Sequence, residues 1–113
     1  MSLKNFFPEI ISKHPQAEIP FKGVTSHLIQ ALEQQIIFMN FENDVEVPEH
    51  SHAAQWGIVL EGEIELTIEG QTQIFQKGDY YYIEKDQKHS AKVKKGYKDI
   101  TLFDQKDRYK IKK

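Results

Sequence analysis

Five histidines are the side chains in this sequence best suited to chemistry, and two of them form a pattern. His50 and His52 are separated by a single residue, in a stretch that has the character of a β-strand. Because successive side chains of a strand point to opposite faces, this spacing places both imidazoles on one face. His89 begins a later strand, and Ala91 and Val93 share its face. A third imidazole could therefore meet the first two inside a β-barrel.

Three inward-facing neutral imidazoles would suit a divalent first-row transition metal. A chance His-x-His pair is the competing interpretation, because five histidines in 113 residues make such a spacing common. Of the other histidines, His14 precedes Pro15, which is typical of an exposed loop, and we assign His27 no role. The pair therefore needs support from the residues around it.

Short segments with β-strand character surround the histidines. They span residues 36–41, 56–60, 64–68, 80–83, 91–93 and 100–103. Turn-forming pairs such as Glu61-Gly62 and Lys95-Gly96 separate them. Residues 56–60 are apolar on both sides, as expected of a strand that is buried on both faces. The regular spacing of short strands and turns predicts an all-β sandwich or barrel.

The N-terminal residues 1–24 predict an arm in front of the strands. Residues 4–13 could form a short helix with Pro8 near its first turn, and Pro15 and Pro20 end any continuation. The start has no apolar stretch typical of a signal peptide, and the longest apolar run, 36–39, is too short to span a membrane. We therefore expect a cytoplasmic protein that does not contact a membrane.

Length and composition exclude several classes of protein. The 113 residues, of 13.3 kDa, suffice for one domain, which we place at 1–113. Hydrophobic residues make up 39% and aromatic residues 12%, enough for a packed core. The chain has no cysteine, which excludes a disulfide scaffold, a zinc finger and a cysteine nucleophile.

The charges divide unevenly along the chain, although the net charge is only −2. Residues 1–75 hold three lysines and eleven acidic residues, whereas 76–113 hold eleven lysines, Arg108 and six acidic residues. A basic surface for nucleic acid is one interpretation, but a single arginine and an acidic total argue against it. We expect no nucleic-acid partner, and neighbouring strands or faces of opposite charge instead.

The histidine segments resemble the two sequence motifs of the cupin superfamily. Residues 48–67 resemble the first motif, which runs His-x-His, three or four residues, Glu, six residues, Gly. Residues 78–89 resemble the second, which runs Gly, five residues, Pro-x-Gly, two residues, His. The resemblance covers a motif core of 48–93. It implies an all-β fold, the double-stranded β-helix or jelly-roll barrel, here with a short N-terminal helical segment.

Several positions depart from the family pattern. Asp44 replaces a Gly, Gln55 a Glu, Glu84 a Pro, Asp86 a Gly and Val93 an Asn. The changes at 84 and 86 affect turn geometry alone, because aspartate tolerates turn conformations. The change at Gln55 affects chemistry, since an amide carries no charge and cannot act as a base near neutral pH.

The resemblance implies a metal site whose ligands are His50, His52 and His89, with Gln55 as the fourth. Gln55 could instead hydrogen-bond a histidine or a water molecule. A shell of three histidines and one glutamine leaves the full charge on the metal, which lowers the pKa of a bound water. Such a shell favours Fe, Ni, Zn or Cu over Mn.

A few further residues are candidates for the lining of a pocket. Gly57 shares a face with Gln55 and would leave space beside the metal, unless it serves tight strand packing alone. Tyr80 or Tyr82 could place a hydroxyl in the barrel, unless both are plain core. Asn40 interrupts an apolar strand, or else marks its end.

These features together favour a metal-binding cupin that acts as a metalloenzyme on a small polar or carbonyl metabolite. The superfamily resemblance allows dioxygenase, isomerase or lyase chemistry, and no catalytic acid or base is identified in the sequence. The alternative is a non-catalytic cupin that binds or senses a small ligand. Either would have a small-molecule partner, and the resemblance implies a homodimer.

Overall fold

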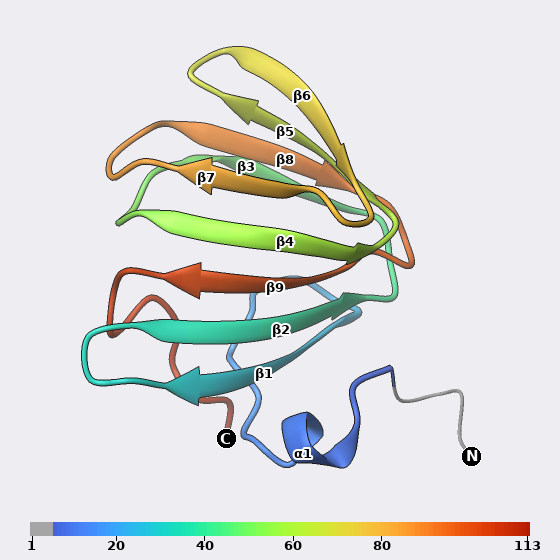
Figure 1. Ribbon diagram of the computed structural model, residues 1–113, viewed down its shortest axis with the longest axis vertical. Helices are drawn as coiled ribbons and strands as arrows, with labels where there is room; N and C mark the ends of the chain where they lie inside the picture. Colours follow the sequence, from blue (N-terminus) through green and yellow to red (C-terminus); the bar gives the residue numbers. More distant parts are fainter. Residues whose placement is uncertain (1–5) are drawn as a thin grey trace.

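The computed structural model describes residues 6–113, which form two antiparallel β-sheets that face each other (Figure 1). The elements in chain order are α1 (Glu9–Ser12), β1 (Val24–Gln30), β2 (Gln35–Phe41), β3 (Val45–His50), β4 (Gln55–Glu61), β5 (Glu63–Ile68), β6 (Gln71–Gln76), β7 (Tyr80–Ile83), β8 (His89–Val93) and β9 (Lys98–Phe103). The predicted all-β jelly-roll architecture with a short N-terminal helix is confirmed.

The larger sheet has the strand order β1-β2-β9-β4-β7 and the smaller sheet the order β3-β8-β5-β6. From β3 onward the chain crosses repeatedly from one sheet to the other, so strands distant in sequence become neighbours. β9 lies between β2 and β4, and β8 lies between β3 and β5. Strands of the basic C-terminal half are therefore inserted between strands of the acidic half.

This interleaving sets opposite charges at facing register positions. Lys92 of β8 pairs in register with Glu46 of β3 on one side and Glu65 of β5 on the other. Lys98 of β9 is in register with Glu61 of β4. Opposite charges on neighbouring strands stabilise a sheet modestly, and folding thus brings together the two charged halves of the sequence.

The core lies between the two sheets and follows the alternation of the strands. In β2 the side chains of Ile37, Met39 and Phe41 are buried, and in β5 those of Ile64 and Leu66 face them from the other sheet. The outward positions between them point away from this core. The same alternation decides which side chains can reach the space between the sheets.

The N-terminal arm begins with a helix shorter than the predicted 4–13. The backbone carbonyl of Pro8 accepts hydrogen bonds from the amides of Ile11 and Ser12, and the helix ends at Ser12. Residues 4 and 5 of the predicted helix lie outside the described part of the chain. In residues 6–113 no helix has the length and apolar character needed to cross a membrane.

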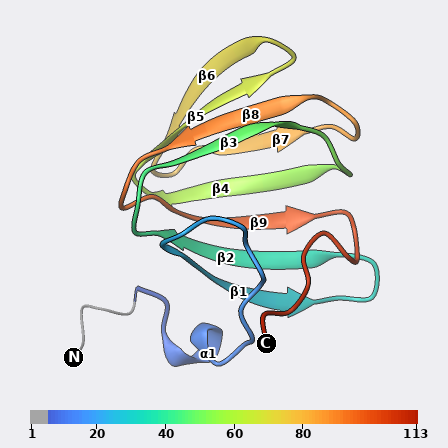
Figure 2. The same ribbon diagram turned by 180° about the vertical axis from the view of Figure 1, so that it is seen from behind.

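The rest of the arm packs against the C-terminal segment, over β1 and β2 (Figure 2). Ala17 forms a β-bridge with Ile111. The amide of Ala17 donates to the Ser26 hydroxyl at 3.1 Å, and that hydroxyl donates back to the Ala17 carbonyl. The two chain segments thus cover the part of the larger sheet that the smaller sheet leaves open.

Candidate metal centre

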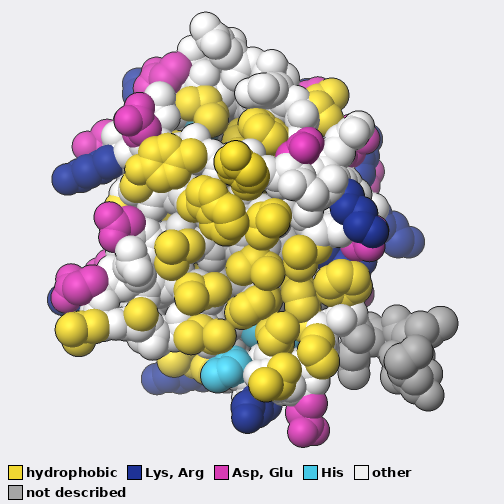
Figure 3. All heavy atoms as spheres, in the orientation of Figure 1, with side chains coloured by type: hydrophobic (Ala, Val, Ile, Leu, Met, Phe, Trp, Pro, Cys, Tyr) yellow, Lys and Arg dark blue, Asp and Glu magenta, His cyan; other side chains and the backbone are white. Residues whose placement is uncertain are grey.

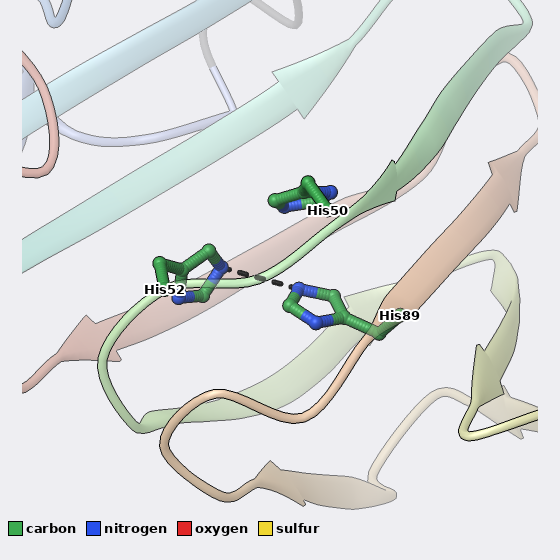
Figure 4. A group of neighbouring side chains, drawn as sticks. All are labelled: His50, His52 and His89. Carbon is green, nitrogen blue, oxygen red and sulfur yellow. Dashed lines mark hydrogen bonds between the residues drawn. The ribbon is translucent and has the colours of Figure 1, made fainter.

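Three histidines meet at one end of the space between the sheets (Figure 4). His50 is the last residue of β3 and His89 the first of β8, and the two are directly opposite in the strand register. His52 follows in the loop between β3 and β4. Ring centroids are separated by 4.3 Å for His50 and His89, 4.7 Å for His52 and His89, and 5.1 Å for His50 and His52.

The loop that carries His52 is fixed by backbone hydrogen bonds from two other loops. The amide of Asp86 donates to the carbonyl of His52, and the amide of Asp104 donates to the carbonyl of Ala54, both at 2.9 Å. β3 ends before His52, so strand alternation alone does not place the second imidazole. His52 joins the other two histidines because this loop turns its side chain toward His50 and His89.

Each of the three imidazoles has its Nδ1 occupied by a backbone carbonyl. The acceptors are the carbonyls of Pro48 for His50 at 2.9 Å, Ala53 for His52 at 2.7 Å and Gln87 for His89 at 2.9 Å. Only a protonated Nδ1 can donate to a carbonyl, so each neutral ring has the Nδ1–H tautomer. The Nε2 lone pairs of all three rings are left free, as in histidines that ligate metals.

The free nitrogens are close enough to share a cation. Nε2 of His52 lies 3.1 Å from Nε2 of His89, and the three candidate ligand atoms lie within 4.8 Å of one another. Two unprotonated nitrogens at this distance repel each other unless a proton or a metal lies between them. With metal–nitrogen bonds of about 2.0–2.1 Å, neighbouring ligand atoms of a tetrahedral or octahedral site lie roughly 2.9–3.4 Å apart. The donor set therefore fits a transition metal.

The electrostatics of the site disfavour a proton as the bridging cation. Burial, together with the charges of Arg108, His89 and His50, lowers the pKa of His52 to about 4. Burial also lowers the pKa of His89. These effects outweigh the backbone hydrogen bonds, which raise both pKa values. The rings of His52 and His89 are consequently neutral at neutral pH, the form that binds metals.

The histidines open into a cavity of about 410 Å³ between the sheets, within the range of ligand-binding pockets. Its walls are mostly apolar, with Met39, Ile64 and Leu66 among the lining side chains. Gln55, at the start of β4, lines the same cavity as the three histidines. The fold thus gathers all four predicted ligand residues at one cavity.

The other predicted pocket residues lie elsewhere. Tyr80 and Tyr82 are 67% and 55% exposed on the outer face of β7, and the residue between them, Tyr81, lines the cavity instead. Gly57 faces inward, but the ring of Tyr81 lies where a side chain at position 57 would be. Asn40 lines a separate shallow surface depression. The tyrosine hydroxyl that β7 places inside the barrel is therefore that of Tyr81, one residue away from the predicted Tyr80 and Tyr82.

Sequence reasoning missed a polar group at the other end of the cavity. Asp99, Thr101 and Phe103 alternate along β9 with Ile100 and Leu102, and it is the first set that faces inward. The apolar character of Ile100 and Leu102 suggests the opposite orientation. The Asp-x-Thr-x-Phe spacing was the available signal, because it places all three side chains on one face.

A model of the cupin domain family matches residues 37–102, which is more than half of the chain. The chain belongs to the cupin family. A comparison of this cupin with curated proteins finds no match.

Solved structures agree with this cupin in fold at low sequence identity. KdgF from Halomonas sp. superposes with a TM-score of 0.73 at 20% identity, over 92% of this chain and 94% of that one. An RmlC-like cupin from Shewanella frigidimarina gives a TM-score of 0.73 at 20% identity, over 93% and 94%. Oxalate decarboxylase from Bacillus subtilis, a protein with Mn(II) centres, gives 0.68 at 18% identity, over 84% of this cupin and 28% of that chain.

Proposed function

We propose that this cupin binds a divalent transition metal through His50, His52 and His89 and acts as a metalloenzyme on a small polar or carbonyl metabolite. The observation that carries the proposal is the hydrogen bonding of the three Nδ1 atoms, which leaves three Nε2 lone pairs free at one cavity. A bound metal would act there as a Lewis acid or as a centre for oxygen. The cavity beside it has room for a small molecule.

Gln55 is the proposed fourth ligand, through its side-chain oxygen. Three imidazoles and an amide are all uncharged, so a cation bound by them keeps its full charge. Such donors favour Fe²⁺, Ni²⁺, Cu²⁺ or Zn²⁺ over Mn²⁺. Mn²⁺ should be included in the comparison, because the structurally similar oxalate decarboxylase has Mn(II) centres.

Changing Gln55 to Glu is expected to shift metal preference toward Mn²⁺. A carboxylate is a harder, anionic ligand, so it strengthens the binding of hard cations more than that of Zn²⁺. We expect the ratio of Mn²⁺ to Zn²⁺ affinity to rise by about tenfold or more, measured by competition with a chromophoric chelator. Gln73→Glu, at an exposed glutamine of β6 outside the cavity, is the control. An unchanged ratio in Gln55→Glu would mean that the residue does not contact the metal.

The function itself is tested by loading the purified protein with each metal in turn and adding small carbonyl and hydroxylated metabolites. Product formation or oxygen uptake that requires both metal and His89 supports a metalloenzyme. Ligand binding at the metal without any turnover would instead support the alternative, a cupin that binds or senses a small molecule. Failure of the wild-type protein to bind any of the metals would contradict the metalloenzyme, and binding of a small molecule by the metal-free protein would then support the alternative.

We further propose that the protein pairs with a second copy through the outer face of its larger sheet. Figure 3 shows apolar side chains spread across this face. Its outward positions include Ile36, Phe38, Trp56, Ile58, Leu60, Tyr80, Tyr82, Ile100 and Leu102. The charged residues at the outward positions of β2, β4, β7 and β9 are Lys98 and Glu61, which are opposite each other in the strand register. A largely apolar face with one acidic group, Glu61, suits an isologous contact with its own copy.

Replacing Trp56 by Glu is expected to convert a dimer into a monomer. Trp56 is 36% exposed and stacks on Tyr80 with ring centroids 6.2 Å apart, near the middle of this face. A carboxylate there would lie unpaired in the contact between two copies. Sedimentation velocity measures the change, and Ile74→Glu, at an exposed apolar residue of the other sheet, is the control. A monomeric wild type would contradict the proposal.

A further inference from the structure

Three buried side-chain atoms among residues 6–113 have no hydrogen-bond partner, and all three belong to residues that line the histidine cavity. They are Oδ1 of Asp99, Oγ1 of Thr101 and Nε of Arg108. Native proteins satisfy nearly all of their buried polar groups, so each exception needs an explanation. The gathering of all three at one cavity indicates that a polar molecule completes their hydrogen bonding.

Asp99 is held in a fixed orientation by two tyrosines. Its Oδ2 accepts hydrogen bonds from the hydroxyls of Tyr97 at 2.8 Å and Tyr81 at 3.3 Å. Burial raises the pKa of both tyrosines, so the hydroxyls remain protonated donors. Gly57 makes this arrangement possible, because any side chain at that position would overlap the Tyr81 ring. With Oδ2 occupied and Asp99 only 3% exposed, Oδ1 is the atom left for a ligand.

Burial also raises the pKa of Asp99 to about 7, although the two tyrosine hydroxyls lower it. The carboxyl group is therefore present in both protonation states near neutral pH. A hydroxyl group is a suitable partner for both, since it donates to a carboxylate and accepts from a carboxylic acid. The titratable groups that share this end of the cavity are Tyr81 and Tyr97, whereas Tyr109 packs against Phe103 and Arg108 toward the histidine end.

The histidines and Asp99 stand at opposite ends of a row of side chains on β9. The Phe103 ring lies 5.4 Å from the His52 ring. Thr101 is two residues and Asp99 four residues before Phe103 on the same face of β9. At about 3.4 Å per residue, Asp99 and Phe103 are roughly 14 Å apart along the strand. A chain of about six carbons would span this distance once a metal–oxygen bond at one end and a hydrogen bond at the other are included.

We propose that Asp99, Tyr81 and Tyr97 form a hydroxyl-binding subsite of the cavity. Its ligand is a small molecule with an oxygen-donor group at the histidine end and a hydroxyl group at the other, which bonds to Oδ1 of Asp99. The apolar walls between them would pack against the carbon chain. The histidine end of this assignment rests on the proposed metal function, whereas the hydroxyl end rests on the protein atoms alone.

The subsite is tested with a matched pair of probes, 6-hydroxyhexanoate and hexanoate, by calorimetry on the zinc-loaded protein. We expect the hydroxylated probe to bind at least about tenfold more tightly, because a hydrogen bond to a buried charged group contributes strongly. Equal affinities, or no binding of 6-hydroxyhexanoate at millimolar concentration, would overturn the subsite.

Two variants separate recognition from a structural role. The triple variant Asp99→Leu, Tyr81→Phe, Tyr97→Phe replaces the whole network by apolar groups of similar shape, and it is expected to lose the tenfold preference while keeping its zinc affinity. Asp99→Asn keeps an acceptor for both tyrosines and turns an N–H toward the cavity. Above the pKa of Asp99, wild type should bind 6-hydroxyhexanoate far better than 6-methoxyhexanoate, and Asp99→Asn should bind the two alike.

The failure of the metal proposal would be recognised separately. Zinc affinity is measured first, without any probe. If zinc does not bind, the same probe pair is compared on the metal-free protein, where a retained hydroxyl preference supports the subsite and its absence overturns it. A preference that survives in the triple variant would also overturn the assignment.

Discussion

Replacing His52 by alanine is expected to lower the affinity for Zn²⁺ by at least ~100-fold. Loss of a residue that only hydrogen-bonds to a metal ligand lowers metal affinity by about 10- to 100-fold, and loss of a ligand itself should cost more. His52 supplies an Nε2 that lies 3.1 Å from that of His89 and is kept unprotonated by the Nδ1 bond to Ala53. Removal of this donor leaves two imidazoles and Gln55. The affinity is measured by competition with a chromophoric chelator, in parallel for His50→Ala and His89→Ala.

His14→Ala is the matched control for these variants, because His14 lies in the N-terminal arm and outside the cluster of the three histidines. It should bind zinc as the wild type does. Zinc should also raise the unfolding temperature of wild type and of His14→Ala, since a ligand that binds the folded state alone stabilises it. Wild-type affinity in His52→Ala would refute the ligand assignment for that residue.

Asp99→Asn is expected to become progressively more stable than the wild type as the pH rises from about 4 to about 7. The pKa of Asp99 is raised by burial to about 7 from an ordinary value of 3.8. Below the lower value the carboxyl group is protonated in folded and unfolded chains alike. Between the two values unfolding releases a proton, so the wild type loses stability as the pH rises. The shift corresponds to a difference on the order of 4 kcal/mol above pH 7.

Urea unfolding at a series of pH values, with a chelator present, measures this difference. His52 and His89 act in the opposite direction, because a lowered pKa in the folded state makes stability rise with pH, for His52 between about 4 and 6.5. Their contribution is common to both proteins and cancels in the comparison. Asp107→Asn, at an exposed carboxylate, should track the wild type. A pH-independent difference between Asp99→Asn and wild type would contradict the burial of a protonated carboxyl group.

The fold could be predicted from the sequence because its signals are local or belong to a motif. Strand alternation and turn residues gave the β architecture, and the spacing of His50, His52 and His89 gave the motif. The positive φ of 66° at Asp86 confirms that this position, a glycine in the family pattern, needs a left-handed conformation that aspartate tolerates. These features depend on short stretches of chain whose geometry is nearly fixed.

The lining of the cavity could not be predicted in the same way, because it depends on which face of each strand turns inward. On β7 three consecutive tyrosines leave the orientation undetermined, and the structure buries Tyr81 rather than Tyr80 or Tyr82. On β9 the apolar residues Ile100 and Leu102 lie on the outer face, where apolar side chains of neighbouring strands continue the same surface. When both faces of a sheet are apolar, the strands lack the alternation of apolar and polar residues that would identify the inward face from the sequence.

The charge asymmetry of the sequence likewise acquires a structural meaning only in the fold. The acidic and basic halves look like separate surfaces when they are read along the chain. The interleaving of β8 and β9 with strands of the first half brings Lys92 and Lys98 into register with glutamates. The fold thus sets two lysines of the basic half against glutamates of the acidic half.

X-ray absorption spectroscopy of the zinc-loaded wild-type protein tests the metal centre most directly. Three imidazole nitrogens at about 2.0–2.1 Å are predicted, with one or more oxygen ligands completing the shell. Multiple scattering from the imidazole rings gives their number independently of the metal–ligand bond lengths. A zinc ion bound by fewer than three imidazoles, in a shell dominated by carboxylate or water oxygen, would contradict the assignment of His50, His52 and His89.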